Sequence, residues 1–182
     1  NPIEDIRIDT VGIPFRCNNV KIAEDGEILV KGENVMLGYW NKKAETDKVL
    51  VDGWLHTGDI GKFVNGFLKI TDRKKDILIT PGGDNISPVK VETALNNSNY
   101  IDQSLVYGDN KPYLVALLVL NSEIDINEKN LSDEIEKINK NLTKIEKIKK
   151  FFVIKEKFSI ENGMMTPTLK LKRYKIIEKY KS

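Results

Sequence analysis

The sequence predicts an α+β fold in two parts, a small distorted β-barrel or sheet over residues 1–71 and an α+β domain over residues 72–182. The first part has short apolar runs separated by glycine-containing turns, which is typical of β-hairpins. The second part also has segments whose apolar residues recur every three or four positions, which is typical of amphipathic helices. We place the boundary between them at Asp72.

Two hairpins and one short helix are expected in the first part. Residues 20–31 alternate around the turn Glu24-Asp25-Gly26. Residues 61–70 contain Asn65-Gly66, the strongest two-residue hairpin signal. Residues 44–50 are long enough for about two helical turns.

The second part is expected to combine a capped helix with a central strand. A helix over residues 89–97 follows Pro88, and Ser87 is a plausible cap. Residues 101–107 and 113–120 are predicted strands. The second strand is almost continuously apolar, so we expect it to be covered on both faces.

A longer amphipathic helix follows, and Ser132 and Asp133 are its candidate caps. Residues 151–154 are a further predicted strand, and residues 174–180 a terminal helix. The apolar stripe of the longer helix has spacings of four and three: Leu131, Ile135, Ile138, Leu142 and Ile145.

Composition excludes several classes of function. The formal net charge is +2, and the lysines of residues 129–150 are balanced by glutamates with no aromatic residues between them, so we expect no nucleic-acid partner. No apolar run approaches the ~20 residues of a membrane helix.

Cys17 is the only cysteine, which excludes an internal disulfide, and we expect it to be partly buried. His56 is the only histidine, so we expect it to be structural and expect no metal site.

The segment Asp72–Pro88 is the most unusual stretch. Five consecutive charged residues, Asp72–Asp76, precede a short apolar run and then Pro81-Gly82-Gly83-Asp84-Asn85. A charged run does not suit a core, and adjacent glycines favour positive φ or close backbone approach. The pattern indicates a hinge that carries a ligand-facing loop, and the alternative is an exposed turn before a hairpin.

Five ordered motifs across the chain resemble those of the adenylate-forming superfamily, which includes acyl-CoA synthetases, luciferases and peptide-synthetase adenylation domains. Motifs in a fixed order are far more specific than any single one. The sequence looks most similar to the long-chain fatty acyl-CoA synthetases. The motifs are GEILVKGENVMLGYW (26–40), TGD (57–59), DRKKD (72–76), GGDNISP (82–88) and TPTLKLKR (166–173).

The resemblance implies a reaction in two steps. A fatty acid carboxylate attacks the α-phosphate of ATP to give an acyl-adenylate and pyrophosphate, and the CoA thiol then attacks the acyl carbon and releases AMP. Residues 72–182 would be a mobile lid domain that rotates about Asp72 between the steps, and an exposed polar side chain would suit this pivot. The implied cofactors are ATP, CoA and Mg²⁺, which arrives with ATP.

The resemblance also implies two nucleotide contacts. Asp59 would accept hydrogen bonds from the ribose hydroxyls, because a carboxylate suits a cis-diol. Arg73 would contact the nucleotide nearby, because its donor fork suits oxygen-rich ligands. The alternatives are a turn aspartate bonded to its own backbone and a surface ion pair of Arg73 with Asp72 or Asp76.

Lys170 is the implied catalytic residue. The superfamily often has Pro-x-x-x-x-Gly-Lys-x-x-Arg, and anchoring on Arg173 places the lysine at 170, with Leu169 in place of glycine. A mobile cation at the α-phosphate would stabilise charge that develops in the transition state. Lys172 remains an alternative.

The loop Gly82, Gly83, Asp84 and Asn85 would serve the thioester step, because small residues let the pantetheine arm pass close to the backbone. The family usually has Gly-Gly-Glu-Asn, and Asp84 keeps the charge with a shorter reach. The alternative is an ordinary β-turn.

The family's upstream phosphate loop and Thr-Glu element are not in this sequence. The resemblance therefore implies a carboxy-terminal fragment that is inactive alone, with the missing N-terminal domain, fatty acid, ATP and CoA as partners. Any membrane contact would come through the missing part, and the expected location is the cytoplasm or the cytoplasmic face of an internal membrane. The alternatives are an adenylate-forming ligase for another carboxylic acid and a non-catalytic interaction domain of the same fold.

Overall fold

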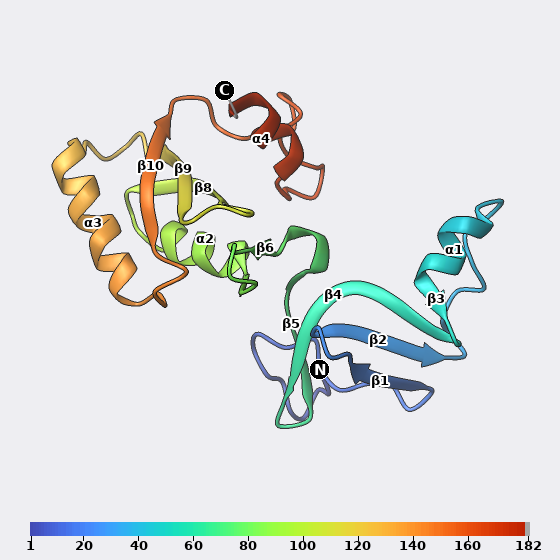
Figure 1. The fold of residues 1–182 in the computed structure, drawn as a ribbon. Coiled ribbons are helices and arrows are strands. Elements are labelled where there is room, and N and C mark those ends of the chain that lie inside the picture. Colours follow the sequence, from blue (N-terminus) through green and yellow to red (C-terminus); the bar gives the residue numbers. More distant parts are fainter. Residues whose placement is uncertain (181–182) are drawn as a thin grey trace. The chain divides into compact units, whose positions relative to one another are not determined.

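The computed structural model describes residues 1–180, which form two compact units that divide between Ile77 and Leu78 (Figure 1). Unit 1 precedes this division and is mainly β-sheet, and unit 2 follows it and combines a sheet with helices. The predicted α+β class is confirmed. Within residues 1–180, no helix is both long and apolar enough to cross a membrane.

Unit 1 is a five-stranded sheet organised around the long strand β4. The order is β1-β2-β4-β3, and β5 also pairs with β4. Both predicted hairpins and the short helix are present. The elements are β1 (Asn18–Ile22), β2 (Glu27–Gly32), α1 (Lys43–Val49), β3 (Leu50–Val51), β4 (Trp54–Val64), β5 (Phe67–Arg73) and a 3-10 turn (Lys74–Asp76).

Two local features place β5 against β4. Asn65 and Gly66 have φ values of 50° and 84°, as a tight hairpin turn with two left-handed residues requires. The register shifts between Ile60 and Gly61. A Cβ at Gly61 would lie 2.6 Å from the carbonyl oxygen of Lys69, so only glycine fits this close approach.

Unit 2 contains a three-stranded sheet in the order β10-β9-β8. Strand β9 is central, as predicted, antiparallel to β8 and parallel to β10. The elements are β6 (Leu78–Ile79), β7 (Asn85–Ile86), α2 (Pro88–Asn96), β8 (Ile101–Tyr107), β9 (Leu114–Leu120), α3 (Glu128–Lys140), β10 (Ile148–Ile154) and α4 (Arg173–Tyr180).

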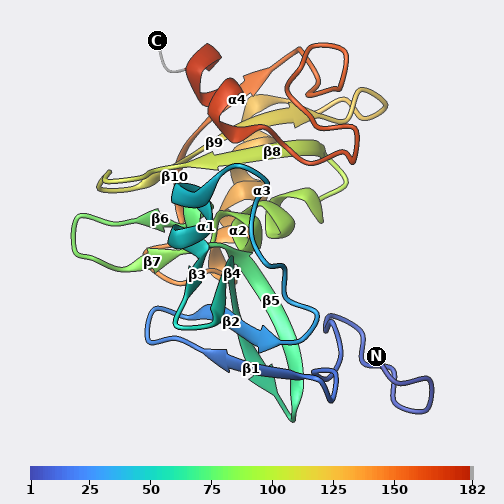
Figure 2. The ribbon, with the colours of Figure 1, turned by 90° about the vertical axis from the view of Figure 1, so that its right-hand side faces the viewer.

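Each face of this sheet has its own apolar core. Figure 2 shows α2 on one side of β8 and β9, and α4 on the other. The first core joins Val106 and Ala116 of the sheet to Leu95 of α2 and also includes residues of α3. The second core joins Leu105 to Ile176 of α4. This arrangement leaves the turns before α2 and α4 exposed at the surface, where the predicted site residues lie.

The structure corrects three expectations. The cap of α3 is Asn127, whose side chain accepts a backbone N–H of the first turn, so Ser132 and Asp133 lie inside the helix. Leu142 lies beyond the end of α3 yet is buried, because the apolar stripe continues into the following turn. Cys17 is exposed rather than partly buried.

Candidate functional site

Asp59 and Arg73, the predicted nucleotide contacts, lie opposite each other on β4 and β5. Arg73 Nε is 2.7 Å from Asp59 Oδ1. The side chain of Asp59 is 22% exposed and that of Arg73 is 54% exposed, so both present polar atoms at the surface. The sequence suggested Asp72 or Asp76 as ion-pair partners of Arg73, and the structure shows an ion pair with Asp59.

A cavity of about 340 Å³ in unit 1 adjoins this pair. Its walls include Gly58 and three cationic residues, Arg73, Lys74 and Lys75. Clustered positive charges attract anionic ligands, and the neighbouring Asp59 carboxylate can accept hydrogen bonds from hydroxyl groups. The combination suits a ligand that carries both phosphates and hydroxyls.

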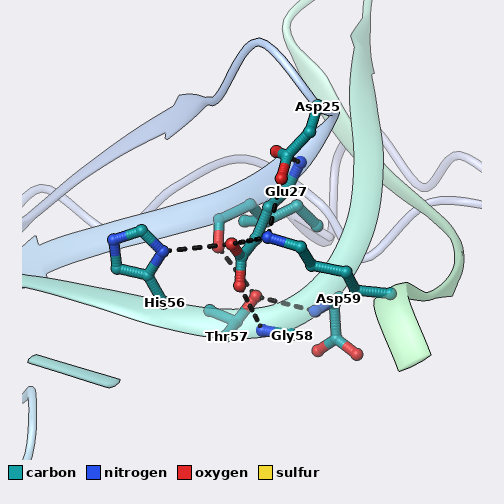
Figure 3. Close-up of polar contacts among 8 residues, drawn as sticks. Asp25, Glu27, His56, Thr57, Gly58 and Asp59 are labelled. Atoms are coloured by element: carbon teal, nitrogen blue, oxygen red, sulfur yellow. Dashed lines mark hydrogen bonds and ion pairs between the residues drawn. The ribbon is translucent and has the colours of Figure 1, made fainter. Parts of the chain in front are cut away.

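Glu27, at the start of β2, holds the backbone before Asp59 (Figure 3). Its side chain is 5% exposed. Glu27 Oε1 accepts the N–H of Gly58 at 2.9 Å, and Oε2 lies 3.0 Å from His56 Nδ1 and 2.9 Å from Lys74 Nζ. Gly58 has a φ of 71°, which glycine adopts without steric cost, so its N–H can point towards Glu27.

Thr57 fixes the other end of this turn. Its hydroxyl donates to the carbonyl of Ile28 on β2 at 2.7 Å and accepts the N–H of Asp59 at 3.1 Å (Figure 3). The Asp59 carboxylate meanwhile faces Arg73. In the sequence Thr-Gly-Asp, the threonine therefore anchors the turn, the glycine permits it, and the aspartate presents its carboxylate.

The charges around Glu27 stabilise one another. Burial raises the pKa of Glu27, but hydrogen bonds from Lys74, His56 and Gly58 outweigh it, so this pKa is below its ordinary value. The hydrogen bond from Lys74, at 2.6 Å, also lowers the pKa of Asp25. Hydrogen bonds to Asp25 and Glu27 raise the pKa of Lys74. All three groups are therefore charged at neutral pH.

Asp72, the predicted hinge, is buried. Only 6% of it is exposed, and it pairs in register with Ile60 of β4. Its Oδ1 accepts the N–H of Arg73 at 2.7 Å. The expectation of an exposed pivot is wrong because β5 continues through Arg73 and keeps Asp72 in the sheet. The role of Asp72 as a hinge stays a prediction.

The loop Gly82–Asn85 closes the small hairpin formed by β6 and β7 in unit 2. The N–H of Gly83, which has a φ of 86°, donates to the carbonyl of Thr80 at 2.9 Å. The hydroxyl of Thr80 accepts the N–H of Asp84 at 3.0 Å and lies 3.3 Å from Asp84 Oδ2. The loop is exposed, hydrogen bonds to Thr80 hold it, and its two glycines leave the backbone accessible.

A second cavity, of about 440 Å³, adjoins this loop within unit 2. One wall contains Thr80 and Pro81 of the hairpin. The other walls carry Tyr113 and four lysines, so the cavity can bind an anionic group and stack a planar one. The lysines are Lys111, Lys144, Lys147 and Lys149.

Lys170 lies on an exposed turn between Met165 and Leu171, which form an isolated β-bridge. The N–H of Lys170 donates to the hydroxyl of Thr166 at 3.0 Å, and its carbonyl accepts the N–H of Thr166 at 2.8 Å. Leu169 has a φ of 59°, in the left-handed region where the superfamily's glycine would be unstrained. Within residues 1–180, we find no ion pair of the Lys170 ammonium.

Arg173 fastens this turn to α2. Its Nη1 is 2.7 Å from Glu92 Oε1, and its Nη2 pairs with Oε2. The two side chains are only 15% and 9% exposed, and Glu92 Oε1 also accepts the N–H of Val106. Lys172 is partly buried beside Arg173, whereas Lys170 is exposed.

The structure brings Asp59 and Arg73 together, while Lys170 and Gly82–Asn85 occupy separate turns of unit 2. Glu27 and Glu92 were missed by sequence reasoning. Their partners lie 47 and 81 positions away, at Lys74 and Arg173, and no local pattern marks such contacts. In the described part of the chain, no group of three or more histidine, cysteine, aspartate or glutamate residues could hold a metal ion.

Comparison with known proteins gives one family match and several relatives. Residues 75–182 match the family described as the AMP-binding enzyme C-terminal domain. The chain is 35% identical to a long-chain-fatty-acid–CoA ligase of Mycobacterium tuberculosis, over 98% of this chain and 34% of that protein. It is 37% identical to long-chain-fatty-acid–CoA ligase 5 of Rattus norvegicus, over 91% of this chain and 30% of that protein. The chain spans about a third of the length of these curated relatives.

Solved structures show the same fold. The O-succinylbenzoate coenzyme A synthetase of Bacillus subtilis, in complex with AMP, is 32% identical with a TM-score of 0.75, over 93% of this chain and 35% of that chain. The adenylation domain of a carboxylate reductase from Mycobacterium chelonae is 26% identical with a TM-score of 0.77, over 95% of this chain and 28% of that chain.

Proposed function

Because the chain belongs to the AMP-binding enzyme family, we propose that it is the C-terminal part of a long-chain fatty acid:CoA ligase. The whole protein would convert ATP, a fatty acid and CoA into acyl-CoA, AMP and pyrophosphate through an acyl-adenylate. The similarity to long-chain-fatty-acid–CoA ligases of a bacterium and a mammal supports this substrate class.

The Asp59–Arg73 pair beside its cationic cavity is the observation that carries the proposal. The Asp59 carboxylate would accept hydrogen bonds from both ribose hydroxyls of ATP. Arg73 would turn its guanidinium from Asp59 towards ligand oxygens, for which its planar fork is suited. Mg²⁺ would be bound together with the phosphates of ATP.

Lys170 would act in the adenylate-forming step. As the fatty acid carboxylate attacks the α-phosphate and pyrophosphate leaves, negative charge develops on the phosphoryl oxygens, which an ammonium group stabilises. The exposed turn and the anchor at Arg173 fit a long, mobile cation on a fixed base. Lys172 is the second candidate.

The glycine loop and the lysine-lined cavity of unit 2 would serve the thioester step. The phosphates of CoA would meet the lysines of the cavity, and Tyr113 offers a ring for the adenine. Gly82 and Gly83 would leave room for the pantetheine arm. Asp84 is bonded to Thr80, so we expect it to support the loop.

Exposed apolar residues of unit 1 support a further domain as partner. Trp40 is 90% exposed, and several other large apolar side chains of residues 1–40 are exposed as well. Such a concentration is typical of a surface covered by another part of a protein. We place the phosphate loop and the fatty acid pocket in that upstream domain, with the enzyme in the cytoplasm or on the cytoplasmic face of an internal membrane.

The experiment measures product formation from a panel of acids by the longer protein, which is this chain together with the proposed upstream domain. We expect acyl-CoA and pyrophosphate from palmitate, ATP and CoA, and no product from these 182 residues alone. The similarity to the O-succinylbenzoate ligase makes an aryl acid the second candidate, and turnover restricted to such acids would favour it. No pyrophosphate with any acid would contradict the proposal and favour a non-catalytic interaction domain.

A further inference from the structure

Lys74 fastens the chain beyond the predicted hinge to the β-sheet of unit 1. Its ammonium lies 2.6 Å from Asp25 Oδ2 and 2.9 Å from Glu27 Oε2. Asp25 belongs to the turn between β1 and β2, and Glu27 begins β2. One lysine on the connecting segment is thus held by two carboxylates of a hairpin far away in the sequence.

These contacts are placed where they oppose a rotation at Asp72. Any change of φ or ψ at Asp72 moves the backbone that follows, including Lys74, relative to the sheet that holds Asp25 and Glu27. Glu27 itself cannot follow, because it is buried and also bonded to Gly58 and His56. A large turn at Asp72 would therefore draw the Lys74 ammonium away from both carboxylates and break its ion pairs.

We propose that Lys74 is a positioning residue whose ion pairs with Asp25 and Glu27, here termed the Lys74 clamp, hold the connecting segment on unit 1 and control rotation at Asp72. Arg73, the residue before Lys74, lies opposite Asp59. Closed, the clamp would favour the arrangement in which this pair can bind a nucleotide. Its effect on the two half-reactions rests on the proposed function, whereas its effect on the segment's mobility does not.

The chain provides a matched control for this inference. Lys75 is the next residue, belongs to the same 3-10 turn and is exposed. Within residues 1–180, we find no ion pair of its ammonium. Replacing Lys75 removes the same charge from the same segment and leaves the clamp intact.

The first test measures hydrogen exchange in this 182-residue chain. The reporting amides are those of Arg73, which donates to Asp72, and Ile77, which donates to the carbonyl of Arg73. In Lys74→Met we expect them to exchange roughly threefold to tenfold faster, the factor expected for losing the ion pairs of a half-exposed lysine, one of them to a buried carboxylate. Lys75→Met and Lys74→Arg should exchange like the original chain. Unchanged exchange in Lys74→Met, or equal acceleration in Lys75→Met, would overturn the proposal.

The salt dependence of hydrogen exchange is a second test of the Lys74 clamp. At about 1 M NaCl the screening length falls to roughly 3 Å, which weakens partly exposed ion pairs. Exchange at Arg73 and Ile77 should therefore rise with salt in the original chain and remain high and salt-independent in Lys74→Met. Amides of β9 serve as the folding control and should be unaffected. Equal salt dependence in both proteins would count against the clamp.

The functional test uses the longer protein and assays its two half-reactions separately. We expect Asp25→Asn, which weakens the clamp without changing the cationic cavity, to slow adenylate formation while the conversion of supplied acyl-adenylate is unchanged or faster. Equal slowing of both steps would contradict a role in rotation. A longer protein that catalyses neither step before mutation would instead contradict the proposed function, and the exchange result would still decide the clamp.

Discussion

Arg73 Nε lies 2.7 Å from Asp59 Oδ1, across the last pair of residues that joins β5 to β4. This contact places a carboxylate and a guanidinium at one edge of unit 1, each partly exposed. The two groups satisfy each other here, and each can also bind the hydroxyl or phosphate oxygens of a ligand. We therefore expect the pair to serve ligand binding and to contribute little to holding the sheet together.

Removing either member should reduce nucleotide binding far more than stability. In Asp59→Asn and Arg73→Met we expect the unfolding free energy to change by less than about 1 kcal/mol, as for exposed ion pairs. ATP binding to the longer protein should weaken by about tenfold or more, because charged hydrogen bonds are lost. Urea unfolding and ATP titration measure the two effects. Lys69→Met, which removes an exposed ion pair with Asp9 elsewhere on β5, should leave ATP binding unchanged. If ATP bound equally well to the Asp59→Asn variant and to the Arg73→Met variant, this pair would not be part of the nucleotide site.

Removing the buried ion pair of Arg173 and Glu92 should, in contrast, lower the unfolding free energy substantially. Arg173→Met leaves a carboxylate in a site that is 9% exposed, so we expect a loss of about 3–5 kcal/mol in unfolding free energy. Denaturant unfolding of this chain measures it. Lys179 lies on the same helix as Arg173 and forms an exposed ion pair with Glu156. Lys179→Met should therefore barely shift the unfolding midpoint. A small effect of Arg173→Met would show that the turn carrying Lys170 has another anchor.

Leu169 occupies a backbone conformation that favours glycine. Its φ is 59° and its side chain is 67% exposed, so replacing it costs little buried area. A left-handed leucine is strained by about 1–2 kcal/mol, and glycine adds about 0.5–1 kcal/mol of unfolded-state entropy. We therefore expect Leu169→Gly to raise the unfolding temperature slightly. Thr168→Gly, on the same turn at a residue without positive φ, should lower it. Marked destabilisation by Leu169→Gly would contradict this conformation.

The contribution of Glu27 should disappear in acid. Its folded-state pKa is depressed, because hydrogen bonds from Lys74, His56 and Gly58 outweigh its burial. A carboxylate of this kind stabilises the fold above its unfolded-state pKa and loses that effect as pH falls through its folded-state pKa. Glu27→Gln should therefore cost about 1–3 kcal/mol at neutral pH. The difference in unfolding free energy between this variant and the original chain should shrink as the pH falls below the pKa of an ordinary glutamate. Urea unfolding at a series of pH values measures it. A difference that does not change with pH would contradict this role of Glu27.

The sequence predicted what is decided locally. Asn65-Gly66 specified its hairpin through the φ values that only such residues adopt easily, and Ser87 capped α2 as expected. The central position of β9 followed from its continuous apolar run. The longer helix was misplaced at both ends, because its apolar stripe continues to Leu142 beyond the helix and its cap, Asn127, lies before the first apolar residue.

Contacts between distant residues could not be predicted. Asp72 was expected at the surface because it begins a charged run, yet the register of β5 buries it. Lys74 and Lys75 are equivalent in the sequence, and only the position of the β1–β2 turn gives Lys74 two carboxylate partners. The roles of Lys170 and the glycine loop were inferred from motif order and remain predictions.

The most direct measurement compares Lys170→Ala with Lys172→Ala in the longer protein, assaying the two half-reactions separately. We expect Lys170→Ala to abolish most adenylate formation while supplied acyl-adenylate is still converted to acyl-CoA, and Lys172→Ala to retain both steps. This result would show that the Lys170 side chain is required in the first step alone, as a role at the α-phosphate predicts. Retention of both steps in Lys170→Ala would contradict that role and point to Lys172.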